Sequence, residues 1–175
     1  MAVLPIVLYP DTRLREQARP VTAVDERLRR LVKDMAETMY EASGVGLAAT
    51  QVGVMQRLAL IDCDPRGEQS QLIVLINPEI LTRSGDSYEE EGSLSVPGYN
   101  ANVHRATNVR ARWQDLDGQS HEVEADGLFA IALQHEIDHL DGKLFIDYLS
   151  PLKREMFKKK YRKMQQAAQE ARETA

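Results

Sequence analysis

The stretch GLFAIALQHEIDHL, residues 127–140, combines apolar side chains at helical spacing with four ionisable ones. Asp126 before it can cap a helix, and Gly142 is suited to end one. Because apolar groups surround the predicted helix, we expect it to be buried on most of its circumference. Buried ionisable groups are costly unless they are paired or bind a metal, so this helix is expected to carry a site. The four groups are His135, Glu136, Asp138 and His139.

The two histidines of this helix have the spacing of metal ligands. His135 and His139 are four residues apart, so a helix places both imidazoles on one face, within reach of one ion. Glu136 would lie beside a water on that ion, where a carboxylate can take up a proton. Alternatively, the two histidines could be ordinary helix residues that form hydrogen bonds to their neighbours. The pattern His-Glu-x-x-His within an apolar helix makes this alternative less favoured. Two imidazoles do not complete a metal site, so a third ligand has to come from elsewhere.

The composition describes a globular chain. Its 175 residues suffice for one compact domain, 43% of them are hydrophobic and 28% are charged. No apolar run approaches the roughly 20 residues that cross a bilayer, and the N-terminus has no signal-peptide pattern, so we expect a cytoplasmic protein without membrane contact. The single cysteine, Cys63, excludes an internal disulfide. Its apolar, strand-like surroundings indicate a buried structural thiol.

The charge is unevenly distributed along the chain. Residues 151–175 contain eight Lys or Arg and three Glu, a net charge of +5, which leaves −10 for residues 1–150 because the whole chain carries −5. Such a run is most often a solvated helix face, but it also suits a phosphate-rich partner. We expect no direct contact with DNA.

The other predicted elements favour an α+β fold. Residues 22–42 predict a helix that Thr22 or Asp25 caps and Gly44 ends. Its apolar stripe consists of Val24, Leu28, Leu31, Val32, Met35 and Met39. Strand-like runs follow at 58–62 and 72–76.

A hairpin and a last helix complete the prediction. Residues 107–115 and 120–125 alternate in polarity around Asp117 and Gly118, which is a hairpin signal. A final helix follows Pro151. The mixed order of helices and strands is typical of an α+β fold.

Two further segments have unusual compositions. GVGLAATQVG, residues 44–53, has glycines that permit close backbone approach to a ligand, without the lysine of a phosphate-binding loop. EEEGSLSVPG, residues 89–98, places three carboxylates beside a glycine and two serines. Each is a weak signal alone, because glycine-rich turns and acidic loops are common.

Together with the central helix, these segments resemble the peptide deformylase family. Its motifs are Gly-x-Gly-Leu-Ala-Ala-x-Gln, Glu-Gly-Cys-Leu-Ser and Gln-His-Glu-x-Asp-His. They correspond here to residues 44–51, 91–95 and 134–139, in the same order. The resemblance extends over about the whole chain, from YPDTRLR near its start to LFIDYLSPLK after the third motif.

The resemblance implies an architecture for the whole chain. It implies an N-terminal helix, antiparallel or mixed sheets around a central metal-binding helix, and a C-terminal helix. Residues 1–150 would form the catalytic domain. Residues 151–175 would form a basic helix that extends the same single domain and, as in the family, contacts the ribosome.

The resemblance also implies one divalent metal ion, with one ligand changed. The family binds ferrous iron, with nickel, cobalt or zinc as replacements, through two histidines and the cysteine of the second motif. The matching residues are His135, His139 and Ser93, so the thiolate is replaced by a hydroxyl. A hydroxyl is far less acidic than a thiol, so we expect weak metal binding and impaired catalysis. The serine is either an engineered replacement or a natural variant.

The implied reaction removes the N-formyl group from the initiator formylmethionine of nascent polypeptides and releases formate. Glu136 would take the proton of the attacking water, while the Gln51 side chain and the Leu94 backbone N–H would stabilise the oxyanion. Arg105 would form an ion pair with Glu91 in support, and Asp138 would act behind the ligands. The substrate-binding positions implied are Val45, Gly46, Gly92, Leu128, Ile131 and Ala132. Core packing explains the last three nearly as well.

Other interpretations of the same residues are possible. A general zinc endopeptidase would share His-Glu-x-x-His but would not need residues 44–51. A non-catalytic, ribosome-associated binding protein would account for Ser93 and the basic tail. Less favoured are Ser93 as a nucleophile with His135 as its base, and Cys63 as a substitute ligand.

Overall fold

The computed structural model describes residues 2–174 and has the expected α+β fold. Its three α-helices are α1 (Glu26–Glu41), α2 (Gly127–Leu140) and α3 (Pro151–Glu173). The strands are β1 (Gly46–Ala48), β2 (Leu58–Ile61), β3 (Ile73–Ser84), β4 (Ser87–Ser93), β5 (Val96–Arg105), β6 (Asn108–Gln114) and β7 (Ser120–Ala125). Three short 3-10 helices lie at Thr12–Arg15, Ala49–Val52 and Phe145–Tyr148.

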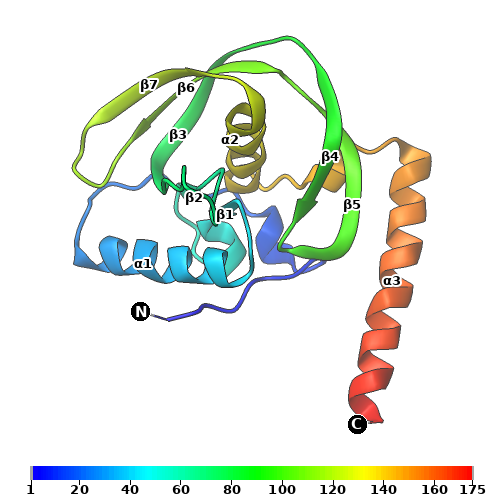
Figure 1. Cartoon of the computed structure of the whole chain (residues 1–175). Helices are drawn as coiled ribbons and strands as arrows, with labels where there is room; N and C mark the ends of the chain where they lie inside the picture. The colour runs from blue at the N-terminus through cyan, green and yellow to red at the C-terminus, as the bar shows by residue number, and fades with distance from the viewer. Residues whose placement is uncertain (1, 175) are drawn as a thin grey trace.

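The strands form two antiparallel sheets with α2 between them. The larger sheet has the order β1-β2-β3-β6-β7, and β4 and β5 form a separate hairpin. In Figure 1, α2 lies between β3 on one side and the β4–β5 hairpin on the other, while α1 lies below the larger sheet. Alanine and leucine side chains of α2 join a core cluster with the sheet residues Ala59, Ile61, Leu75 and Ala111. The prediction that this helix is buried around most of its surface is therefore confirmed.

The ends of α2 agree only in part with the prediction. Asp126 occupies the N-cap position, but its side chain makes no capping hydrogen bond, so the expectation that it caps the helix was wrong in that respect. The C-terminus closes as expected at Gly142, which has a φ of 76°. The N–H of Gly142 donates to the carbonyl of His139 at 3.1 Å, and that of Lys143 donates to Asp138 at 2.9 Å. These are the two hydrogen bonds of a Schellman motif.

Helix α1 begins as predicted but ends differently. The Asp25 carboxylate accepts a hydrogen bond from the Leu28 N–H at 3.0 Å, so Asp25 and not Thr22 is the cap. The helix ends at Glu41, and Ser43, which follows the C-cap, adopts the terminating left-handed conformation with a φ of 58°, so the prediction that Gly44 ends it was wrong. Gly44 is needed for another reason, since a Cβ there would lie 2.9 Å from Leu94 Cδ1.

The strand predictions were correct for four strands of the larger sheet and missed the other three strands. The runs at 58–62 and 72–76 lie in β2 and β3, and β6 pairs with β7 as the predicted hairpin. Strands β1, β4 and β5 were not predicted. The acidic segment at 89–98, whose composition is common in loops, instead spans the end of β4 and the start of β5.

The N-terminal segment ties two of the motif segments together. The Val7 N–H donates to the Gln51 carbonyl at 2.7 Å, and the Tyr9 N–H donates to the Ser95 carbonyl at 2.8 Å. Val7 is also buried in a core cluster that includes Val96 and Phe145. Residues 7–9 therefore fix the backbone at 51 relative to the backbone at 95.

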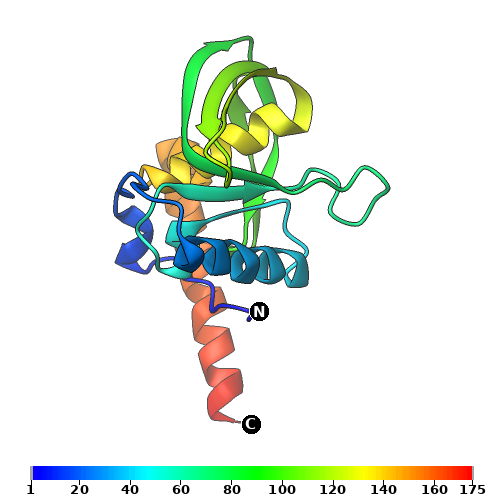
Figure 2. The same cartoon turned by 90° about the vertical axis from the view of Figure 1, so that its left-hand side faces the viewer.

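Helix α3 is attached to the rest of the protein by few side chains. Ser150 caps it and Pro151 is its first residue. Only Phe157 and Tyr161 are buried, against Tyr9 and Tyr99, while the C-terminal half extends away from the other elements (Figures 1 and 2). None of the helices within residues 2–174 has the length and apolar character needed to cross a membrane.

The glycine that ends α2 provides a test of this packing. A Cβ at Gly142 would collide with the Arg15 carbonyl oxygen and would also occupy a left-handed conformation. We expect Gly142→Ala to lower the free energy of unfolding by about 2 to 4 kcal/mol. Gly118→Ala is a matched control, because Gly118 has a φ of 79° and no atom within 4 Å of an added Cβ. It should lose only about 1 to 2 kcal/mol in urea unfolding, and equal losses would contradict a role of the Arg15 contact.

Candidate metal centre

The imidazoles of His135 and His139 face each other on α2. Their Nε2 atoms lie 3.2 Å apart. Two nitrogens that each lie about 2.0 to 2.1 Å from one ion, at a tetrahedral angle, are about 3.3 Å apart. Burial, reinforced by His135, lowers the pKa of His139 well below its usual value, so this imidazole is in the neutral form that binds metals. The spacing of the pair and the neutral form of His139 thus fit a shared cation.

A buried ion-pair network orients His135. Its Nδ1 lies 2.9 Å from Glu91 Oε1, and a proton on Nδ1 leaves the Nε2 lone pair free for a metal. Arg105 donates to both oxygens of Glu91 at 2.8 and 2.9 Å, so the expected ion pair is confirmed. Burial alone would raise the pKa of Glu91, but the hydrogen bonds from His135 and Arg105 outweigh it and lower the pKa to about 2. Glu91 is therefore ionised and holds the ring in one orientation.

Asp138 completes this network behind the ligands. Arg105 donates to Asp138 Oδ2 at 2.6 Å, and the Tyr148 hydroxyl donates to the same oxygen at 2.7 Å. The Arg105 guanidinium also lies over the Tyr148 ring, 4.8 Å from its centre. Asp138 does not line the cavity beside His135. Its side chain is connected to Glu91 and His135 through Arg105.

The Glu136 carboxylate is buried beside Gly46 and has one oxygen, Oε1, without a hydrogen-bond partner among residues 2–174. A Cβ on Gly46 would collide with Oε2, so the carboxylate rests directly against the glycine. Burial raises the pKa of Glu136 to about 7, even though His135 opposes the shift. A carboxyl group with this pKa can both accept and return a proton near neutral pH.

Gln51 has a fixed orientation beside Ser93. Its Oε1 accepts a hydrogen bond from the Ala48 N–H at 2.9 Å, which directs Nε2 toward Ser95 Oγ at 3.1 Å and Ser93 Oγ at 3.4 Å. The Ser95 N–H also donates to Ser93 Oγ, at 3.2 Å. Two N–H groups therefore point at the oxygen of Ser93, an arrangement that suits a negatively charged atom there.

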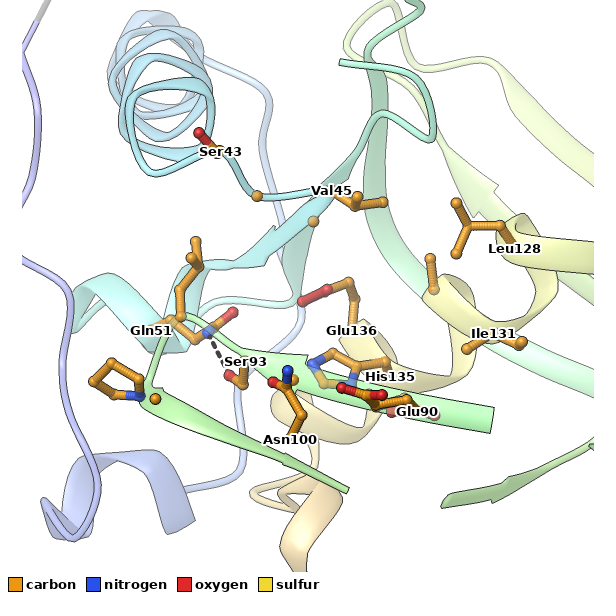
Figure 3. A pocket seen from close by; sticks show the side chains of 18 residues that line it. Ser43, Val45, Gln51, Glu90, Ser93, Asn100, Leu128, Ile131, His135 and Glu136 are labelled. Atoms are coloured by element: carbon orange, nitrogen blue, oxygen red, sulfur yellow. Dashed lines mark hydrogen bonds and ion pairs between the residues drawn. The ribbon is translucent and has the colours of Figure 1, made fainter. Parts of the chain in front are cut away.

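A single cavity of about 530 Å³ brings the predicted residues together. Figure 3 shows it from close by, with Ser93 between Gln51 and His135 in this view. The predicted residues that line it are Val45, Gly46, Gln51, Gly92, Ser93, Leu94, Leu128, Ile131, Ala132, His135 and Glu136. His139 is not among the lining residues, since it is 1% exposed and lies behind His135. Leu128 is 51% exposed, which core packing does not explain.

Several residues around the cavity were not singled out from the sequence. Ser95 contacts both Gln51 and Ser93, and its only signal was its place in the second motif. Glu90 and Asn100 line the cavity because β4 pairs with β5, a pairing that was not predicted. Cys63 does not line it, which agrees with a structural role. The thiol is half-buried beside the core, and burial raises its pKa.

The sequence of this chain is similar to those of known proteins. The polypeptide deformylase family model matches residues 3–155. A peptide deformylase of Alkalilimnicola ehrlichii is 56% identical over 164 residues, which cover 94% of this chain and 92% of the relative. The peptide deformylase 2 of Xanthomonas campestris is 53% identical, with coverage of 94% and 97%.

Solved structures agree with the sequence comparisons. The crystal structure of a peptide deformylase from Legionella pneumophila superposes with a TM-score of 0.89 at 47% identity and covers 95% of this chain and 98% of that one. The deformylase of Ehrlichia chaffeensis in complex with actinonin superposes with a TM-score of 0.86 at 39% identity, with coverage of 94% and 98%. The chain therefore belongs to the polypeptide deformylase family of metallohydrolases, which remove the formyl group from N-terminal formylmethionine.

Proposed function

We propose that this chain hydrolyses formylmethionyl peptides in the cavity of Figure 3, with a metal held more weakly than a cysteine ligand would hold it. The observation that carries the proposal is the convergence of three separate segments on that cavity. Gln51 follows β1, Ser93 ends β4, and His135 and Glu136 lie on α2.

The metal ligands in this proposal are His135, His139 and, weakly, Ser93. The 3.2 Å between the two Nε2 atoms supports the histidine pair. Ferrous iron is the expected ion, and nickel, cobalt or zinc could replace it, since imidazole suits all of them. When bound, the ion supplies a Lewis acid that activates water near neutral pH.

Ser93 should be a poor third ligand for a chemical reason. A thiolate brings a negative charge to the ion, whereas a serine hydroxyl remains neutral at pH 7. The two N–H groups that point at Ser93 Oγ would stabilise a thiolate but also occupy the lone pairs of a hydroxyl. We therefore propose that residue 93 limits metal affinity in this chain.

The proton transfers fall to Glu136. Its free Oε1 would accept the proton of the attacking water and then deliver it to the departing amine. As the formyl carbonyl becomes tetrahedral, Gln51 Nε2 and the Leu94 N–H would donate to the developing oxyanion. Such donors typically contribute ~3 kcal/mol each.

The cavity walls suit an extended peptide with an apolar first side chain. The backbones of Val45, Gly46 and Gly92 would pair with the peptide as an added strand. Leu128, Ile131 and Ala132 line the cavity and would surround the methionine side chain. Because the chain matches deformylases along nearly its whole length, a general endopeptidase is the weaker proposal.

We also propose that α3 contacts the ribosome in the cytoplasm. Six of its cationic side chains are exposed along the middle and end of the helix: Lys158, Lys159, Lys160, Arg162, Lys163 and Arg172. Phe157 and Tyr161 pack α3 into a core cluster with residues 7–149. The helix would therefore be part of one catalytic domain and not a separate module.

Restoring the thiol tests the role of residue 93. Ser93→Cys is expected to raise metal affinity at least tenfold, together with formate release from a formylmethionyl peptide, because a thiolate adds charge to the ligand set. Ser120→Cys, an exposed serine on β7, is the matched control and should change neither. Metal content after dialysis and a formate assay with added nickel measure both quantities. Equal values for the unaltered chain and the Ser93→Cys variant would contradict the proposal, and binding without formate release would favour a binding protein.

The contact between Gly46 and Glu136 separates catalysis from metal binding. Gly46→Ala is expected to displace the carboxylate and lower kcat about tenfold to hundredfold, a part of the hundredfold or more that general acid–base catalysis contributes. Metal affinity should stay within twofold, because neither histidine is touched. The comparison is best made in the Ser93→Cys background, with Gly118→Ala as the control and calorimetry for the metal. A parallel loss of metal affinity would contradict this separation, because it would show that the substitution also disturbs the metal ligands.

Charge reversal tests the ribosome contact without removing buried side chains. The triple variant Lys159→Glu, Arg162→Glu, Lys163→Glu should weaken ribosome binding at least tenfold at low salt and reduce its salt dependence, since fewer phosphates are neutralised. The same change on α1, Arg27→Glu, Arg30→Glu, Lys33→Glu, is the matched control. Sedimentation with ribosomes at several salt concentrations measures both. Equal weakening by the two variants would attribute the effect to net charge alone.

A further inference from the structure

Ser95 has a position that none of the proposed roles uses. It is 0% exposed and lies in the short connection between β4 and β5. Its hydroxyl accepts a hydrogen bond from Gln51 Nε2 at 3.1 Å, which is shorter than the 3.4 Å from the same nitrogen to Ser93 Oγ. The strongest contact of the Gln51 amide nitrogen is therefore with Ser95 and not with the proposed metal ligand.

The orientation of the Gln51 amide follows from its partners. The Ala48 N–H can only donate, so the atom 2.9 Å from it must be the amide oxygen. The nitrogen then faces the two serines with two hydrogens. Ser95 receives one of them, and the second is left for Ser93 and the cavity. A flipped amide would place N–H against N–H at Ala48 and is excluded.

The backbones of both partners are fixed independently of this hydrogen bond. The Val7 N–H donates to the Gln51 carbonyl and the Tyr9 N–H donates to the Ser95 carbonyl. The two donors are two residues apart on the N-terminal segment. The Ser95 N–H donates to Ser93 Oγ as well. The hydroxyl of Ser95 therefore meets the amide at a set distance and can select its rotamer.

From this arrangement we propose that Ser95 is a positioning residue for the oxyanion donor. It holds one N–H of Gln51, so that the other faces Ser93 Oγ at 3.4 Å and the cavity, where it would donate to the formyl oxygen as that atom develops negative charge. The proposal rests on the deformylase function proposed above. It adds a residue that acts on the reaction only through Gln51.

The test combines an amide measurement with kinetics. In the unaltered chain, Ser95→Ala should increase hydrogen exchange of the Gln51 side-chain amide at least tenfold in NMR spectra, because that amide loses its shortest acceptor. In the Ser93→Cys background with nickel, Ser95→Ala should lower kcat about tenfold, a part of the hundredfold or more that one oxyanion donor supplies. KM and metal affinity should stay within twofold.

A double-mutant cycle and a control variant distinguish positioning from general damage. In a Gln51→Ala background, Ser95→Ala should change kcat less than twofold, because the residue it positions is absent. Thr38→Val removes another buried hydroxyl, which bonds to the Leu4 N–H and the Asp34 carbonyl and does not line the cavity. It should lower thermal stability and leave kcat unchanged.

The outcomes separate this inference from the proposed function. Unchanged exchange of the Gln51 amide in Ser95→Ala would overturn the inference whether or not the chain releases formate. A tenfold loss of kcat that persists in the Gln51→Ala background would also overturn it, since Ser95 would then act by another route. Absence of formate release from the Ser93→Cys parent would instead count against the proposed function, while the amide measurement would still decide the role of Ser95.

Discussion

The buried guanidinium of Arg105 holds the two halves of the site together. It lies on β5, donates to Glu91 on β4 and to Asp138 on α2, and is 6% exposed. Removing one partner of such a buried network leaves an uncompensated charge, which typically costs about 3 to 5 kcal/mol. The β4–β5 hairpin can therefore dock against α2 in only one register. Because Ser93 is two residues beyond Glu91, this ion pair also determines where Ser93 lies.

A second constraint fixes the opposite wall of the cavity. Gln51 and Ser95 are far apart in sequence. Their carbonyls accept hydrogen bonds from Val7 and Tyr9, which lie on one N-terminal segment, so this segment holds the two residues together. Gly46 allows β1 to approach the Glu136 carboxylate, which any Cβ would prevent. The site thus depends on main-chain hydrogen bonds and on one missing side chain as much as on the groups that carry charge.

The sequence predicted the elements whose pattern is local. Helix α2 was predictable because apolar residues surround it and Gly142 ends it, and β6 and β7 because polarity alternates around Gly118. Strand β4 was not predictable, since Glu89 and Glu90 are exposed, Glu91 is buried only through its ion pair, and glutamate has low strand propensity. The pairing with β5 gives the strand its conformation. The positive φ of Ser43 was likewise invisible, because glycine is the residue expected there.

The site divides along the same line. The spacing of His135, Glu136 and His139 on one helix indicated a metal, since i and i+4 share a helix face. Spacing could not connect Gln51 or Ser93 to that helix, because contacts between distant segments leave no local pattern, so only the family resemblance named them. The contact of Ser95 with Gln51 needed coordinates.

In the proposed function, serine in place of cysteine at position 93 would have opposite effects on how tightly the site holds a metal and on the Lewis acidity of a metal that is bound. The scaffold does not depend on that side chain, because Glu91, Arg105 and the N-terminal segment place its neighbours. A neutral hydroxyl would leave a bound ion one charge more positive than a thiolate would, and so a stronger Lewis acid. The same missing charge would make the ion easier to lose. His135 and His139 would bind it as neutral ligands, so no ligand would carry a negative charge. In the proposed function, residue 93 would therefore control how long the site keeps its metal, while the geometry around the metal would be set by residues that this chain retains.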